Sequence, residues 1–238
     1  VLLLIFMACG CSLTPSARLD GHAWLLQTTG KVSGADLEND LGYRGTSPQL
    51  DLEGAAAIGR SSITADWAHL HRDANGEVTR GFAFAGVPVA TQTNIASHTD
   101  ADLVTAFYGF RIGPRIISIT PGIGGAYARY DVTASGVTRT PSLLGVSVGA
   151  PFTAESHANQ PFPIGALQLE SIPLGWLDLI ARVDGFGIPQ GQMIDGQGLV
   201  RVRFEHLSVD AGYRYIRLNA GDTRINIKGA MVGAGVYF

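Results

Sequence analysis

Apolar and polar residues alternate with a period of two along most of this chain. The clearest example is the segment 199–205, LVRVRFE, where the valines and the phenylalanine share one face and the charged residues share the other. The same alternation runs through 50–54, 176–184 and 209–215. Successive side chains of a strand point to opposite sides, so the pattern predicts β-strands with one apolar and one polar face.

The breaks between these segments also alternate, between short and long. Short breaks occur near 59–60, 87–88, 113–114, 173–175 and 206, and longer polar breaks occur at 33–47, 72–77, 133–160, 187–195 and 219–223. The predicted strands are 22–32, 48–58, 61–71, 78–86, 88–97, 98–112, 115–132, 160–172, 176–187, 195–204, 207–218 and 224–238. They make about twelve antiparallel strands. The count falls to ten if the region 78–112 holds fewer crossings, and to eight if the first strand is only an arm.

The final strand carries the most specific motif. The chain ends RINIKGAMVGAGVYF, with Val232, Val236 and Phe238 on an apolar face and Tyr237 on the other. A terminal strand of this kind, closing on an aromatic residue, resembles the C-terminal signature that the assembly machinery of bacterial outer-membrane β-barrels reads. The resemblance implies an all-β, closed, antiparallel transmembrane barrel in the outer membrane of a Gram-negative bacterium. Its partners would then be the outer-membrane lipids and the barrel assembly machinery.

Composition agrees with that class. The chain has 238 residues, 46% hydrophobic and only 16% charged, whereas charged residues make up about a quarter of soluble domains. A net charge of −3 argues against nucleic acid as a partner. No stretch reaches the roughly 20 apolar residues that a spanning helix needs.

The first eleven residues predict an export signal. The run VLLLIFMA is followed by CGCS, which matches the apolar region and cleavage zone of a secretory signal and also resembles a lipoprotein signal acylated at Cys9 or Cys11. The prediction is therefore a signal over 1–11 and one barrel domain over 12–238. These two cysteines are the only ones, so neither a disulfide framework nor a cysteine zinc site is expected.

The polar phase of the strands predicts which side chains face the lumen. A charge on the lipid face costs about 2–4 kcal/mol near the midplane, so the charged phase should point inward. The predicted lumen residues of the last third are Arg182, Arg201, Arg203, Arg214, Glu170, Asp178, Asp184, Glu205 and Asp210. Gln27 and Lys31 are placed inside by the same rule. The cluster is either a salt-bridge network that fills the barrel or a charged constriction that selects solutes.

Small and aromatic residues add two further expectations. Small residues at 122, 124, 126, 128, 229, 233 and 235 would leave open volume in the lumen. The aromatic residues predicted to form the two interfacial girdles are Trp24, Trp67, Tyr108, Phe110, Tyr127, Tyr130, Tyr213, Tyr215 and Tyr237. The long segment 133–160 either folds into the mouth as a constriction or extends its two flanking strands beyond the membrane, and the strand-like composition of 143–148 favours the extension.

Signals for chemistry are weak. Ser156 and His157, and Ser97 and His98, are sequence neighbours, and neighbours on a strand point to opposite faces. His69 and His71 share the predicted lipid face with Trp67. The acidic cluster at 36–40 lacks the spacing of a calcium loop and is expected to be solvated. No catalytic residue, metal site or cofactor is therefore predicted, and the chain is not expected to be an enzyme.

The leading functional hypothesis is a porin-like channel for passive diffusion of small polar or charged solutes. The alternative is a closed structural barrel whose external loops bind partners. A third hypothesis, a lipid-modifying enzyme at the rim, would require His157 or another rim residue as a base.

Overall fold

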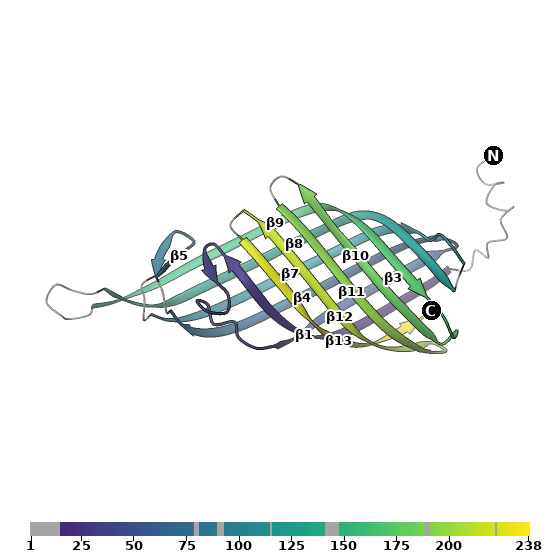
Figure 1. Cartoon of the computed structure of the whole chain (residues 1–238), viewed down its shortest axis with the longest axis horizontal. Coiled ribbons are helices and arrows are strands. Elements are labelled where there is room, and N and C mark those ends of the chain that lie inside the picture. The colour runs from purple at the N-terminus through teal and green to yellow at the C-terminus, as the bar shows by residue number, and fades with distance from the viewer. Residues whose placement is uncertain are drawn as a thin grey trace.

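The computed structural model is an all-β closed barrel (Figure 1). It describes residues 15–78, 81–89, 93–114, 116–140, 148–188, 191–221 and 223–238. The strands are β1 (Pro15–Val32), β2 (Ala35–Asp36), β3 (Ser47–Ile58), β4 (Ser61–Glu77), β5 (Phe82–Phe84), β6 (Val87–Val89), β7 (Asn94–Phe110), β8 (Ile117–Thr140), β9 (Val148–Ser171), β10 (Leu177–Ile188), β11 (Gly191–Phe204), β12 (Leu207–Ala220) and β13 (Thr223–Tyr237).

Ten of these strands form the wall of the barrel. Each pairs antiparallel with its neighbour in the order β1, β3, β4, β7, β8, β9, β10, β11, β12 and β13, and β13 returns to pair with β1. The closing register runs from Arg18 opposite Tyr237 to Lys31 opposite Arg224. Closure pairs the last strand of the wall with the first, and a sheet can cross a bilayer only as such a closed barrel.

The expectation of twelve strands was wrong, and ten, one of the alternatives, is correct. The two extra strands were placed at 78–86 and 88–97, but this region contains the short hairpin β5–β6, which forms a sheet of its own. The hairpin turns at Ala85 and Gly86, both with positive φ. Phe84 and Val89 are buried in an apolar cluster with Leu37 and Leu41, so they pack against a loop instead of facing lipid.

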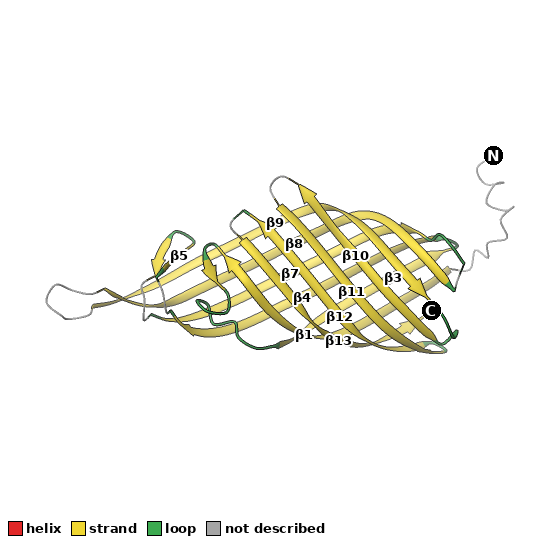
Figure 2. Cartoon of the chain, viewed as in Figure 1, coloured by secondary structure: helices red, strands yellow, loops and turns green. Residues whose placement is uncertain are grey.

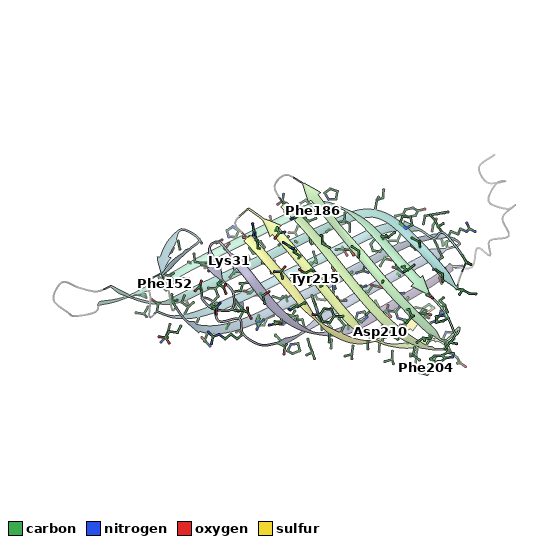
Figure 3. All side chains as sticks on the ribbon, in the orientation of Figure 1. Lys31, Phe152, Phe186, Phe204, Asp210 and Tyr215 are labelled. Atoms are coloured by element: carbon green, nitrogen blue, oxygen red, sulfur yellow. The ribbon has the colours of Figure 1, made fainter. Side chains whose placement is uncertain are left out.

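The outside of the wall is an apolar belt. Large hydrophobic side chains project outward from all parts of the wall, as the stick view shows (Figure 3). They include Leu19, Leu25, Leu50, Ile58, Ile63, Val104, Ile123, Leu167, Leu179, Val183, Val200, Val209 and Val232. An outward apolar band with a polar interior is the pattern of a membrane-spanning barrel. No helix in the described part of the chain has the length and apolar character needed to cross a membrane.

The two ends of the barrel differ, as Figure 2 shows. Short connections at 59–60, 111–116, 172–176 and 205–206 lie at the end that also holds the C-terminus. The opposite end carries β2, the β5–β6 hairpin and the far ends of β8 and β9, which are 24 residues each. The predicted extension of the strands flanking 133–160 is therefore correct. Short turns are periplasmic in outer-membrane barrels, so the longer end is external.

The N-terminal predictions lie outside the described residues. The signal over 1–11 and the lipidation of Cys9 or Cys11 both stay predictions. The first strand was expected to begin at residue 22, whereas β1 already pairs with β3 at Pro15.

Candidate functional site

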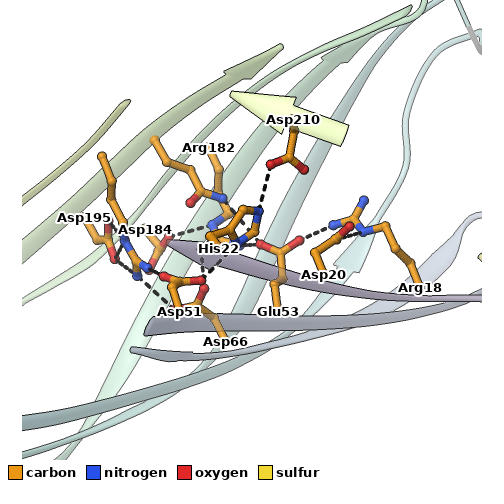
Figure 4. A network of polar contacts seen from close by, with 12 residues as sticks. Arg18, Asp20, His22, Asp51, Glu53, Asp66, Arg182, Asp184, Asp195 and Asp210 are labelled. Carbon is orange, nitrogen blue, oxygen red and sulfur yellow. Dashed lines mark hydrogen bonds and ion pairs between the residues drawn. The ribbon is translucent and has the colours of Figure 1, made fainter. Parts of the chain in front are cut away.

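Three arginines cross the middle of the barrel interior and are sealed from solvent. Arg182, Arg201 and Arg214 come from β10, β11 and β12, and their side chains are at most 1% exposed. Carboxylates from β1, β3 and β4 on the opposite wall, and from β10, β11 and β12 themselves, surround these arginines (Figure 4). We call this set the charge layer. It consists of Arg18, Asp20, His22, Asp51, Glu53, Asp66, Arg182, Asp184, Asp195, Arg201, Asp210 and Arg214.

Arg214 joins three strands besides its own. Its Nη2 lies 2.6 Å from Asp195 Oδ2 on β11 and 2.9 Å from Asp66 Oδ1 on β4. Its Nη1 donates to Asp51 on β3. The guanidinium also lies 5.4 Å from the centre of the Trp24 ring, within the range of a cation–π contact.

Arg182 makes a second set of contacts across the lumen. Its Nη1 donates to Glu53 Oε2 at 2.6 Å, and its Nε donates to Asp184 Oδ1 at 3.2 Å. Its Nη2 lies 3.5 Å from Asp66 Oδ2, so Asp66 bridges Arg182 and Arg214. The two arginines are thereby linked to both sides of the barrel.

Arg201 and His22 complete the layer nearer the periplasmic end. Arg201 Nη2 lies 2.9 Å from Asp210 Oδ2 and 3.1 Å from Asp20 Oδ2. His22 lies between two carboxylates, with Nδ1 3.3 Å from Asp51 and Nε2 3.2 Å from Asp210. The layer is thus one connected network spanning the barrel interior.

Most of the predicted lumen residues lie inside the barrel. Two of them, Arg203 and Glu170, lie at the periplasmic mouth of the lumen. Asp178, Asp184 and Asp210 are buried along with the three arginines. Arg203 Nη2 lies 2.9 Å from Asp178 Oδ1, and Glu170 lies 3.8 Å from Arg111.

The placement of Glu205 in the lumen was wrong. It lies exposed in the turn between β11 and β12 with a positive φ of 48°. The period-two pattern continued past the end of the strand, and this made the turn residue look like a lumen residue.

Several inward residues were missed, and most of them lie on β1. Arg18, Asp20, His22 and Trp24 face inward there, and Asp195 does so on β11. The prediction had put Gln27 inside, whereas Leu26 is fully buried and Gln27 is on the outward phase. Lys31 is likewise exposed. In the external half of this strand the interior is apolar, so polarity no longer marks the inward face.

The expectation of open volume beside the small residues was also wrong for the closing strand. A Cβ added at Gly233 would meet His22, and one added at Gly235 would meet Asp20 and the Ser208 hydroxyl. The space left by these glycines is therefore filled by the charge layer.

Apolar side chains fill the barrel on the external side of the charge layer. A buried cluster joins Trp24, Leu26, Leu70, Phe107, Ala126, Ile164, Ala166, Met193, Ile216 and Met231. A second cluster, which includes Phe84 and Val89 of the hairpin and Tyr43 of the loop after β2, lies further out. Burial raises the pKa of the Tyr43 hydroxyl.

A cavity of about 590 Å³ lies on the periplasmic side of the charge layer. Arg18, Arg111, Glu170, Asp178 and Arg203 supply its charged lining. Polar volume is therefore found at one end of the lumen, and apolar packing at the other.

Six of the aromatic residues predicted for the girdles face outward, and the girdles themselves stay a prediction. Tyr108, Phe110, Tyr127, Tyr213 and Tyr215 are exposed on the wall. Trp67 is half-buried on the same outward face.

The other three aromatics point inward, so their assignment to the girdle was wrong. Trp24 lies beneath Arg214, Tyr130 packs against the outer apolar cluster, and the Tyr237 hydroxyl is 3.4 Å from Arg201 Nη1. Each one fills interior space that would otherwise be empty.

Histidines and aspartates form a separate polar cluster on the outer face of the barrel, on the external side of the apolar belt. The register places His69 opposite Asp102, His71 opposite Asp100, and Asp73 opposite His98. Hydrogen bonds with Asp73 and Asp100 raise the pKa of His98. A hydrogen bond from His71 lowers the pKa of the Asp100 carboxyl.

Two weaker candidate sites from the sequence, the Ser97–His98 pair and the acidic segment 36–40, have structural roles. Ser97 is buried and donates to the Leu41 carbonyl, while His98 faces outward, so the two lie on opposite faces as expected. Asp36 Oδ1 accepts hydrogen bonds from the backbone N–H groups of Glu38 and Asn39. The acidic loop thus uses this carboxylate to hold its own turn.

Comparison with known proteins identifies only an architecture. No family model matches the sequence, and no curated protein matches it. Among solved structures, the chain is similar to the attachment invasion locus protein Ail of Yersinia pestis at 13% identity and a TM-score of 0.40, covering 95% of this chain and 100% of that one. It is also similar to the outer membrane protease OmpT of Escherichia coli at 12% identity and a TM-score of 0.42, covering 94% and 96%.

The CymD monoaromatic hydrocarbon channel is similar at 8% identity and a TM-score of 0.40, covering 94% of this chain and 88% of that one. Scores of this size carry no argument about what this chain does. The closed ten-stranded wall and the outward apolar belt have the architecture of a membrane-spanning β-barrel, in agreement with the class that the terminal strand predicts.

Proposed function

We propose that this chain is a closed outer-membrane barrel whose function lies at its external surface, and that it does not conduct solutes. The observation that supports this most strongly is the charge layer. Three arginines that are almost free of solvent contact lie across the middle of the lumen, each within hydrogen-bond distance of carboxylates on other strands. The interior cluster around Leu26 and Met231 supports the same conclusion from the external side.

Energetics favour a layer that stays closed. Passage of a solute would require Arg214 or Arg182 to leave carboxylates on the opposite wall. Separating one partner of a buried ion pair costs about 3–5 kcal/mol, because it leaves an uncompensated charge. Each arginine here has more than one partner, so opening the layer would break several such contacts at once.

If the barrel is closed, its function of binding partners lies with the segments at its external end. β8 and β9 stay paired as far as Thr140 opposite Val148, well beyond the apolar belt. The β5–β6 hairpin and the loop after β2 pack together beside them. These segments would offer contacts to host or envelope partners, while the charge layer stabilises the barrel that carries them.

A diffusion channel remains the second candidate because of the periplasmic cavity. Its volume of about 590 Å³ would hold small solutes, and Glu170, Asp178 and Arg203, all predicted constriction residues, line it. For this function the charge layer would have to open.

Single-channel recording in a planar bilayer tests the proposal. The refolded barrel, with folding verified by heat-modifiable gel migration, should be silent, and Arg201→Ala should be less stable and equally silent. Steady openings in the wild-type protein, with an ion preference that changes in Arg201→Ala, would overturn the closed barrel and establish the channel.

A further inference from the structure

The outer face of the barrel carries a cluster that no part of the closed-barrel function uses. His71 on β4 and His98 and Asp100 on β7 each offer one ligand atom, and these atoms lie within 4.8 Å of one another. We infer that His71, His98 and Asp100 form a binding site for a divalent transition metal of the zinc class.

The two histidines already converge on one carboxylate. His71 Nδ1 lies 2.7 Å from Asp100 Oδ1, and His98 Nε2 lies 2.7 Å from Asp100 Oδ2. Around a tetrahedral zinc ion with bonds of about 2.0–2.1 Å, ligand atoms lie roughly 3.3 Å apart. Small side-chain rotations would open these contacts enough to admit the ion.

Asp73 lies where an orienting partner is needed. Its Oδ1 is 2.6 Å from His98 Nδ1, the ring nitrogen that does not face Asp100. Metal-binding histidines commonly donate their other N–H to a carboxylate, which fixes the tautomer and the ring orientation. Asp73 is therefore a positioning residue, and Asp73 Oδ2 also lies 3.7 Å from His71 Nε2.

The donor set fits zinc better than calcium or magnesium. Two imidazoles and one carboxylate are ligands that zinc, copper and nickel accept, whereas calcium and magnesium prefer oxygen alone. Three protein ligands leave a fourth position for water or for an outside donor. Side-chain exposures of 52% for His71 and 44% for His98 leave that position open to solvent.

The site also has a defined height on the barrel. It lies on the same outward face as Trp67 and Val104, which are opposite one another in the register of β4 and β7. His71 is four residues beyond Trp67, or about 10 Å along the membrane normal for a strand tilted by about 40°. A bound ion would therefore sit above the hydrocarbon belt and clamp the external ends of β4 and β7.

Isothermal titration of the refolded barrel with zinc chloride tests this inference. The wild-type protein should bind one zinc per barrel, and cobalt(II) should give the visible absorption of a tetrahedral site. His98→Gln and Asp100→Asn should each weaken zinc binding by about a hundredfold or more. Asp73→Asn should weaken it by about 10–100-fold, the usual effect of losing an orienting carboxylate.

His69→Gln provides the matched control. His69 also faces outward and contacts an aspartate, with its Nδ1 2.9 Å from Asp102 Oδ1, but it lies outside the cluster. This variant should bind zinc as the wild type does. The inference is overturned if the wild type binds no zinc, or if His98→Gln and Asp100→Asn bind as tightly as His69→Gln. All four substitutions lie on the outer surface, and heat-modifiable migration checks that each barrel is folded.

Discussion

At the scale of single residues, substitution of Arg214 is expected to lower the free energy of unfolding strongly. Arg214→Ala would leave Asp51, Asp66 and Asp195 without their shared cation in a buried interior. Removing one member of a buried ion pair costs about 3–5 kcal/mol, and we expect a loss of at least this size. Urea unfolding of the refolded barrel in lipid vesicles, followed by tryptophan fluorescence, measures it.

Arg217→Ala, on the same strand, is the control for that experiment. Arg217 is exposed on the outward phase of β12, and a surface substitution of this kind changes stability by about 0.5 kcal/mol or less. Equal unfolding midpoints for the two variants would show that the charge layer does not stabilise the barrel.

The interior residues could be predicted from sequence only where the inward face is polar. Asp178, Arg182 and Arg201 follow a clear alternation with lipid-facing apolar residues, so their phase was correct. On β1 the inward face changes from Asp20 and His22 near the periplasm to Leu26 further out. A rule that assigns apolar residues to lipid fails there, because the outer half of the lumen is itself apolar.

At the scale of elements, closure between β1 and β13 depends on a glycine. A Cβ at Gly229 would collide with the backbone of Leu25 and Leu26 on β1. Gly229→Leu should therefore lower the folded fraction after refolding, measured by heat-modifiable gel migration. Ala230→Leu, one residue on, faces outward between Leu25 and Tyr213 and should refold like the wild type. Similar folded fractions for the two variants would mean that the wall relaxes easily at this seam.

The β5–β6 hairpin should be held down by one side chain. Phe84 is fully buried among residues of the loop after β2 and of β7, and truncating a buried phenylalanine costs about 3–5 kcal/mol. Phe84→Ala should speed proteolytic cleavage within the external hairpin and leave the barrel heat-modifiable. Ala83→Ser, at an exposed neighbouring position, should be cleaved at the wild-type rate. Equal rates for both variants would contradict the packing role of Phe84.

The strand count shows what pattern reasoning misses at this scale. Segments 78–86 and 88–97 have the length and apolar content of crossings, yet part of this region folds back as β5–β6. Its apolar residues are satisfied by Leu37 and Leu41, which lie about forty residues earlier in the chain. Such long-range packing leaves no local periodicity to read, whereas the terminal strand, whose two faces meet lipid and lumen directly, could be predicted.

On the scale of the whole molecule, the barrel is layered along its axis. Beginning at the periplasm, it contains a polar cavity, then the charge layer, then two apolar clusters that include the external segments. The charged side chains of the charge layer therefore lie between the periplasmic cavity, which solvent can enter, and the apolar clusters, which exclude solvent. The layered interior accounts for the correct lumen predictions near the periplasm and for the wrong placement of Gln27 and Lys31 further out.

This arrangement predicts how salt affects stability. Raising sodium chloride from about 10 mM to 1 M shortens the Debye length from about 30 Å to about 3 Å, which screens ion pairs that solvent reaches. In a closed barrel salt does not reach Arg182 or Arg214, so the urea midpoint should stay nearly constant over that range. In an open channel, water and ions would surround the same arginines and the midpoint would fall as salt rises. Because this measurement needs no conductance, a falling midpoint would argue against the closed barrel even if every bilayer recording were silent.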